Sequence, residues 1–258
     1  MVEKKIYIYN KYDLKLCGIL NEVSDDKCMT IICHARGSHK DSRATFNISK
    51  TLIENEINNF RFDFSSHGES EGDELDANDK KFYEDLESVL DYFKEKDYEE
   101  FILIGASLGG RIISLIDTDK YNIRKMVMWY PAIIYKNIFK RIKNKLFRKK
   151  EEKIALKEGY YLMHGRRKMS LEYLEQERKT NYYKKAISIN VPILIIQGSG
   201  DPFADYHNAI KISQNNKNAK LILVENENHG FKKDDKNLKY ACEETVNFIK
   251  KNKNDSQI

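Results

Sequence analysis

The chain has 258 residues, of which 41% are hydrophobic and 33% charged, enough for one sizeable α/β domain with or without an insertion. It has no run of 18 apolar residues and no signal-type apolar core near its start, so we expect no membrane-spanning helix. The net charge of +5 balances many charges of both signs, and no nucleic-acid-binding motif accompanies it, which argues against a nucleic-acid partner. Four scattered cysteines favour a reduced, cytoplasmic protein, with Cys17 and Cys33 as small core residues.

Strand-like and helical patterns alternate along most of the chain. Short apolar runs predict strands at 6–9, 14–20, 29–33, 57–64, 101–104, 125–130, 191–197 and 221–224. Apolar residues at helical spacing predict helices at 42–55, 79–96, 107–116, 205–214 and 237–250. This alternation predicts an α/β fold with a mostly parallel central sheet and helices on both faces. Ligands bind beyond the carboxyl ends of the strands in such sheets. Four residues suited to chemistry follow predicted strands: His34, Ser107, Asp201 and His229.

Residues 133–186 interrupt the alternation, and we expect them to form a cap insertion in a single domain that spans residues 1–258. Residues 136–150 hold eight Lys and Arg among fifteen positions, with apolar residues at helical spacing, and 164–168 add further positive charge. Two interpretations stay open for these basic stretches. Either an amphipathic helix packs on the domain with its basic face in solvent, or the basic face belongs to a cap that attracts an anionic substrate or surface.

The stretch 101–111 has the order strand, tight turn, helix, with Ser107 at the turn. This is the context of a G-x-S-x-G nucleophile elbow, in which a strained turn lifts the serine hydroxyl off the edge of the sheet. Gly105 and Gly109 lack the side chains that would collide across such a turn. The first N–H groups of the helix face the negative charge that develops in the reaction. The alternative is a glycine-rich turn in which Ser107 serves only as an N-cap.

A serine nucleophile needs a base to accept its proton and an acid to orient that base, and in elbow folds these follow in the order serine, acid, histidine. Asp201 directly follows a buried strand and is the expected acid, whereas Asp205 is expected to begin the next helix. His229 lies in the loop after the last strand and is the expected base, whereas His207 is expected on the surface. The alternatives are a turn-capping Asp201 and a loop or capping His229.

Four stretches together carry a family resemblance: 61–72, the Gly105–Gly109 elbow, 191–198 with Asp201, and 229–231. Over nearly its whole length the chain resembles the α/β-hydrolase superfamily. It is most similar to the small serine esterases of the cinnamoyl (feruloyl) esterase type and to related serine aminopeptidase-like hydrolases.

The resemblance implies an α/β-hydrolase fold with Ser107 as nucleophile, His229 as base and Asp201 as the orienting acid. It also implies an oxyanion hole. One donor is the backbone N–H of Leu108, and the other is the N–H of Arg36, which stands after the usual His-Gly pair.

The chain departs from the family pattern near this second donor. The usual His-Gly pair is His34-Ala35, an apolar or aromatic residue is more common at Arg36, and Ser66 replaces a usual glycine. Arg36 either points into the pocket, where it pairs with a carboxylate or phosphate of the substrate, or points outward as a surface arginine. His34 and Arg36 are the candidate substrate-binding residues.

The expected function is hydrolysis of a small-molecule carboxylic ester or thioester through an acyl-enzyme, with no metal or cofactor. One alternative is an acyltransferase that uses the same three residues. The other is a non-catalytic binding protein on a hydrolase scaffold, which the altered oxyanion loop motivates. The sequence indicates neither the acyl and leaving groups nor the oligomeric state.

Overall fold

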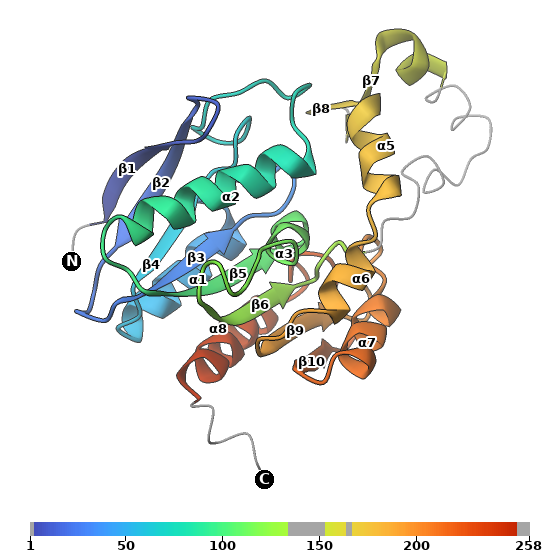
Figure 1. Ribbon diagram of the computed structural model, residues 1–258. Coiled ribbons are helices and arrows are strands. Elements are labelled where there is room, and N and C mark those ends of the chain that lie inside the picture. Colours follow the sequence, from blue (N-terminus) through green and yellow to red (C-terminus); the bar gives the residue numbers. More distant parts are fainter. Residues whose placement is uncertain (1–2, 134–152, 164–166, 252–258) are drawn as a thin grey trace.

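The computed structural model describes residues 3–133, 153–163 and 167–251, and an eight-stranded sheet runs through them (Figure 1). Its strand order is β1-β2-β4-β3-β5-β6-β9-β10. Strand β2 is antiparallel to both of its neighbours, and the strands from β4 to β10 in this order are parallel, which confirms the predicted mostly parallel sheet. The strands are β1 (Lys4–Tyr9), β2 (Lys15–Asn21), β3 (Cys28–Cys33), β4 (Asn59–Phe62), β5 (Glu100–Ala106), β6 (Ile123–Trp129), β9 (Ile193–Gly198) and β10 (Ala219–Val224).

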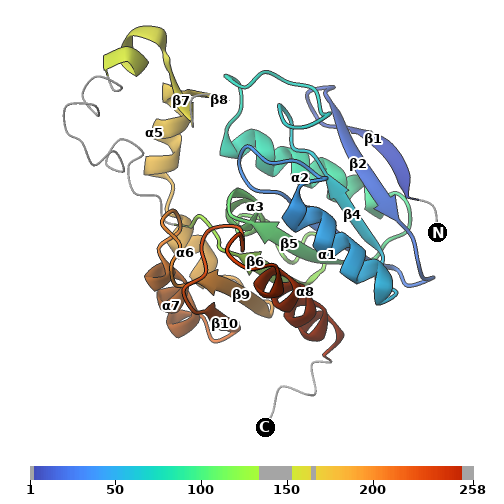
Figure 2. The ribbon, with the colours of Figure 1, turned by 180° about the vertical axis from the view of Figure 1, so that it is seen from behind.

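Helices cover both faces of the sheet, as predicted (Figures 1 and 2). One face carries α1 (Arg43–Glu54) and α8 (Asp235–Lys250). The other carries α2 (Asp79–Lys94), α3 (Leu108–Ile113), α6 (Tyr182–Ile187) and α7 (Tyr206–Asn215). Every strand and helix expected outside 133–186 is present with shifted ends, and the helix after Ser107 ends at Ile113 rather than at 116.

The central strands are buried on both sides because alternate side chains point into two separate cores. In β5, Leu103 packs in the core beneath α2, whereas the next residue, Ile104, packs in the core beneath α1 and α8. Full burial of one such side chain stabilises the fold by about 1.5–3 kcal/mol. Cys17 and Cys33 are completely buried, which confirms that they are core residues.

A segment between β6 and β9, which we call the insert, interrupts the alternation of strands and helices. Its described residues are 153–163 and 167–187. It contains a helical turn at 153–158, the hairpin of β7 (Tyr160–Met163) and β8 (Arg167–Ser170), α5 (Leu171–Lys179) and α6. In both views β7, β8 and α5 stand beside the layers of the main fold, close to the loop that leads into α2. The helix expected at 136–150 and most of the basic stretch at 164–168 lie outside the described residues.

The sequence patterns did not resolve the hairpin, α5 and α6 in the insert, and most of these elements are short. Strands β7 and β8 have four residues each, and α6 has six. Capping signals were nevertheless present. The side chains of Ser170 and Asn181 accept hydrogen bonds from the N–H groups of Tyr173 and Lys184, at the starts of α5 and α6.

Candidate active site

Ser107 lies on a strained turn between β5 and α3. Its φ of 51° is in the left-handed region, which costs a residue with a side chain about 1–3 kcal/mol. A Cβ added to Gly105 would lie 2.4 Å from the carbonyl carbon of Gly109, and one added to Gly109 would lie 2.2 Å from the carbonyl oxygen of Cys33. The helix can therefore pack this closely against β3 and β5 only because both positions are glycine, as the elbow motif predicts.

The hydroxyl of Ser107 faces a histidine rather than the end of its own helix. Ser107 occupies the N-cap position of α3, but its side chain makes no capping hydrogen bond. Its Oγ lies 3.0 Å from Nε2 of His229, and Nδ1 of His229 lies 2.7 Å from Oδ2 of Asp201. These residues follow β5, β10 and β9, whose carboxyl ends share one edge of the sheet. The structure thus brings together the three residues predicted from the sequence, in hydrogen-bonding order.

The carboxylate of Asp201 is held by several donors besides His229. Its Oδ1 accepts hydrogen bonds from the N–H groups of Phe203 (2.7 Å) and Ala204 (2.9 Å), and its Oδ2 accepts one from Gln197 (3.2 Å). Asp201 therefore caps the turn and binds His229 at the same time. Burial alone would raise the pKa of Asp201, but the bond to His229 and the two N–H donors outweigh it and lower the pKa. An ionised Asp201 keeps the proton of His229 on Nδ1, which leaves Nε2 as an acceptor toward Ser107.

The two rival residues have local roles. Asp205 is the N-cap of α7, where its side chain accepts a hydrogen bond from the N–H of His207. The ring of His207 also lies 2.8 Å from Asp205, and its side chain is 62% exposed. The expectations that Asp205 begins a helix and that His207 lies on the surface are confirmed.

The loop after β3, which carries the expected oxyanion donor, is held by His34 from inside. Nε2 of His34 accepts a hydrogen bond from the N–H of Phe64 (3.1 Å), so its proton is on Nδ1, which donates to the carbonyl of Ala35 (2.7 Å). The ring is fully buried and both of its nitrogens are used within the protein, which gives His34 a structural role in the loop, while its role in substrate binding stays a prediction. Burial lowers the pKa of His34 to about 4, which keeps it neutral at physiological pH.

His67 supports the same loop from the segment before α2. Its ring lies 4.9 Å from that of His34, and its Nε2 accepts a hydrogen bond of 3.4 Å from the N–H of Gly37. Burial, aided by the nearby positive charges, lowers the pKa of His67 as well. The left-handed backbone position of the loop falls on Gly37, with φ of 66°, and not on Ala35. The alanine that replaces the usual glycine therefore needs none of glycine's conformational freedom.

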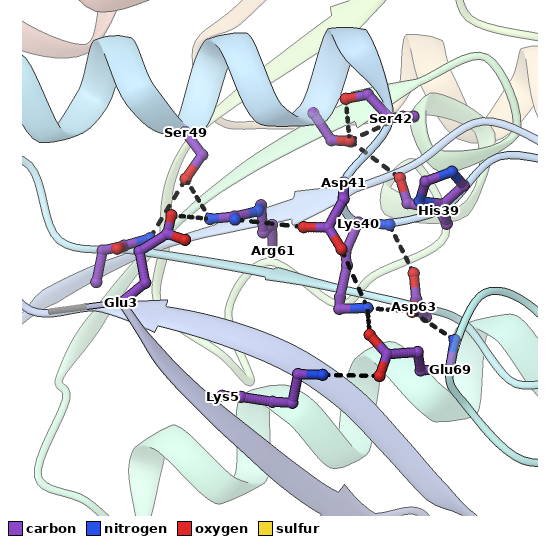
Figure 3. Close-up of polar contacts among 12 residues, drawn as sticks. Glu3, Lys5, His39, Lys40, Asp41, Ser42, Ser49, Arg61, Asp63 and Glu69 are labelled. Carbon is purple, nitrogen blue, oxygen red and sulfur yellow. Dashed lines mark hydrogen bonds and ion pairs between the residues drawn. The ribbon is translucent and has the colours of Figure 1, made fainter.

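At its far end the loop is fixed by a polar cluster of the main fold, called the core anchor, formed by Lys40, Asp63 and Glu69 (Figure 3). Asp63 accepts hydrogen bonds from the backbone N–H (2.6 Å) and the ammonium group (3.0 Å) of Lys40. The same ammonium group lies 2.6 Å from Glu69. The side chains of Lys40 and Asp63 are almost fully buried. The anchor ties the end of the loop to the segment that follows β4.

At its near end the loop is fixed by the insert. The guanidinium group of Arg36 bonds the side chains of Tyr173 and Glu177 in α5 and is only 8% exposed. Arg36 is thus not a surface arginine, and its charge is paired with Glu177, while its role in substrate binding stays a prediction. Arg111 of α3 lies 2.6 Å from the same carboxylate and 2.8 Å from Asp79. We call the five residues Arg36, Asp79, Arg111, Tyr173 and Glu177 the insert anchor.

The sequence analysis assigned no role to most of these supporting residues. Arg111 carried one usable signal, because a charged residue directly before Ile112 and Ile113 in a buried helix needs a partner. Tyr173 and Glu177 carried another, because residues four apart share one face of a helix. Their partners lie far away in sequence, and no spacing rule connects them.

No three His, Cys, Asp or Glu side chains within the described residues are grouped closely enough to hold a metal ion. Of the helices in the described ranges, none is long and apolar enough to cross a membrane.

A family model described as serine aminopeptidase, S33, matches residues 26–180. A search of the curated proteins finds no match. Among solved structures, Est1E from Butyrivibrio proteoclasticus with ferulic acid bound superposes with a TM-score of 0.81 at 21% identity, over 95% of this chain and 97% of that one.

Two further solved structures are similar over nearly their whole length. The α/β hydrolase domain-containing protein 10 from mouse has a TM-score of 0.77 at 14% identity, over 95% of this chain and 98% of that one. An esterase from Pyrococcus furiosus has a TM-score of 0.75 at 17% identity, over 96% and 90% of the two chains. These similarities confirm the predicted α/β-hydrolase fold.

Proposed function

Since the chain belongs to the serine aminopeptidase S33 family of α/β-hydrolases, we propose that it is a serine hydrolase that cleaves a carboxylic ester or thioester. One observation carries the proposal. The hydroxyl of Ser107, on a turn with φ of 51°, lies 3.0 Å from His229, whose other ring nitrogen lies 2.7 Å from Asp201. A nucleophile, a base and an orienting acid in hydrogen-bonded sequence are what acyl transfer to serine requires.

In the first half of the reaction, Oγ of Ser107 attacks the carbonyl carbon while Nε2 of His229 accepts the hydroxyl proton. Asp201 stabilises the imidazolium that forms. The tetrahedral intermediate then collapses, and His229 gives the proton to the leaving alcohol or thiol, which departs and leaves the acyl group on Ser107. In the second half, His229 deprotonates a water molecule that attacks this acyl-enzyme and releases the acid.

The oxyanion of the tetrahedral intermediate needs hydrogen-bond donors, and we assign the N–H groups of Leu108 and Arg36 to this role. Leu108 is the first residue of α3, and the first N–H groups of a helix have no partner within the helix. Its N–H also lies at the positive end of the helix dipole. Loss of one such donor costs an enzyme about a hundredfold to a thousandfold in turnover.

Aromatic side chains beside His229 favour an apolar or aromatic part of the substrate next to the base. The rings of Tyr130 and Phe203 lie 4.7 and 5.4 Å from that of His229, and Phe203 is 41% exposed. The similar Est1E structure holds ferulic acid, an aromatic acid. Feruloyl and other aryl esters therefore stand first in the substrate panel, followed by aliphatic esters and thioesters of increasing length.

A fluorophosphonate probe tests the proposal directly, because it reacts only with an activated serine. We expect labelling of the wild-type protein at Ser107, found by mapping the modified peptide, and none in the variant Ser107→Ala. Turnover of the best ester should fall by at least about a thousandfold in Ser107→Ala, because the three residues act as a unit. His207→Ala, which removes the exposed histidine, is the matched control and should react like the wild type. A folded wild-type protein that is neither labelled nor active would favour a binding protein instead.

A further inference from the structure

We propose that Glu177 of the insert positions both halves of the oxyanion hole, an inference that rests on the hydrolase function proposed above. The two assigned donors belong to segments far apart in the chain, since Arg36 follows β3 and Leu108 begins α3. Each segment also carries an arginine side chain, Arg36 itself and Arg111. Both guanidinium groups contact one oxygen atom, Oε1 of Glu177.

The contacts connect this carboxylate to the segments of both donors through the two arginine side chains. Arg111 lies three residues after Leu108 on α3, and its side chain is 2.6 Å from Glu177. Arg36 supplies its own backbone N–H as the second donor, so the link from that donor to Glu177 runs through a single side chain. A shift of Glu177 would therefore move the two donors relative to each other.

Tyr173, one helical turn before Glu177 on α5, reinforces the link. Its hydroxyl donates to Asp79 (2.7 Å) and accepts hydrogen bonds from Arg111 (3.0 Å) and Arg36. One donor and two acceptor sites are the full capacity of a hydroxyl group. These three hydrogen bonds fix the position of α5 on the main fold. They thereby fix Glu177 next to Arg36 and Arg111.

The cluster is buried and its charges are balanced. The side chains of Arg36, Arg111 and Glu177 are 8%, 0% and 4% exposed, and the charges of the two arginines are balanced by Glu177 and Asp79. Burial alone would raise the pKa of Glu177, but the two arginines outweigh it and lower the pKa, so the carboxylate stays ionised. Buried ion pairs of this kind add little net stability compared with apolar residues of similar size, so the proposed role of the cluster concerns geometry rather than stability.

Glu177 touches neither Ser107 nor the proposed oxyanion position, so it is a positioning residue that acts through Arg36 and Arg111. Its effect should appear in the transition state, because the donors bind the oxyanion and not the ground-state ester. A misplacement of about 1 Å costs roughly a hundredfold in rate. The insert contributes neither the nucleophile, nor the base, nor the acid. Under this proposal it is nevertheless necessary for turnover, because it positions the oxyanion donors.

The test measures kcat and KM on one ester for Glu177→Gln, Arg36→Met and the double variant. We expect kcat to fall roughly tenfold to a hundredfold in each single variant, with KM within about threefold of the wild type. The double variant should be no slower than the slower single variant, because both changes break the same link. Affinity for a boronic acid, which forms an anionic tetrahedral adduct on serine, should fall by the same factor as kcat.

Glu175→Gln is the matched control, since Glu175 lies on the same helix with its side chain 66% exposed, and its kcat should equal that of the wild type. Active-site titration and urea unfolding separate slow turnover from loss of folded protein. If Glu177→Gln does not fold, Arg36→Met carries the test alone, because it leaves the contact between Glu177 and Arg111 in place.

Unchanged kcat per active site in the single variants, or losses that multiply in the double variant, would overturn the positioning role while the hydrolase function stands. A wild-type protein without turnover and without labelling at Ser107 would overturn both.

Discussion

The two ends of the loop after β3 are held by polar clusters of different origin. The core anchor at Lys40 uses Asp63 and Glu69, which lie within the main fold and fewer than 30 residues away along the chain. The insert anchor at Arg36 uses Glu177 and Tyr173, which lie 141 and 137 residues away in a separate segment. Both clusters bury an ion pair, but only the second depends on how the insert sits.

This difference separates stability from activity along a single loop. In the core anchor, Asp63 accepts hydrogen bonds from the backbone N–H groups of Lys40 in the loop and of Glu69 after β4. Loss of this anchor should therefore lower the stability of the whole domain. The insert anchor joins side chains across an interface between segments, so its loss should affect donor geometry first. Changes at the two ends of the loop and in the segments that contact it test this division.

The largest effect on stability is expected for Lys40→Met. Without the ammonium group, the carboxylate of Asp63 stays buried with only N–H donors, and breaking a buried ion pair in this way costs about 3–5 kcal/mol. Urea unfolding measures the loss. The control is Glu69→Gln, which removes the half-exposed partner of Lys40 and should cost much less. Equal midpoints for Lys40→Met and the wild type would show that the core anchor does not stabilise the domain.

Acid should weaken the start of the loop, which His34 holds just before the insert anchor at Arg36. Burial lowers the pKa of His34 to about 4 in the folded protein, from 6.5 in an unfolded chain. Below pH 6.5 the unfolded chain therefore binds a proton that the folded protein does not, and stability falls as the pH drops toward 4, by about 3 kcal/mol from His34 alone. Carboxylates with a lowered pKa, such as Asp201, lose their contribution progressively only as the pH falls below about 5.

Urea unfolding at several pH values between 7 and 4.5 measures this slope. In His34→Gln the slope should be shallower, because one of the two buried histidines with a lowered pKa, His34 and His67, is gone. An unchanged slope would mean that the protons are taken up elsewhere.

The smallest effect is expected where the main fold meets the insert. Ser66 has φ of 61°, and its buried hydroxyl has no hydrogen-bond partner among the residues that the structure describes. Its carbonyl accepts a hydrogen bond from Arg167 of β8. Glycine relieves the left-handed strain and keeps the carbonyl, so Ser66→Gly should stabilise the protein by about 1 kcal/mol after the entropic cost of glycine. Thermal unfolding measures the gain. Ser65→Gly, at the neighbouring position, is the control and should not stabilise. A loss of stability in Ser66→Gly would mean that the serine has a role that this geometry lacks.

The sequence determined the sheet, its covering helices and the position of the nucleophile because these depend on residues that are close together in the chain. Buried parallel strands appear as apolar runs, and the elbow appears as Gly105, Ser107 and Gly109 between a strand and a helix. The order serine, acid, histidine then selected Asp201 and His229, and their nearness to Ser107 in space follows from the parallel strands they terminate.

Only the tertiary structure decided the roles of His34, Arg36 and Glu177. The sequence predicted His34 near a substrate because it follows a strand, and Arg36 because of its place in the family pattern. It contained no sign that the segment after β4 would contact the first and α5 the second. An ion pair between residues 141 positions apart has no period and no motif, and each charge by itself resembles one on a solvated surface. Burial decides which charged residues need a partner, and burial is a property of the packed segments together rather than of any one stretch of the chain.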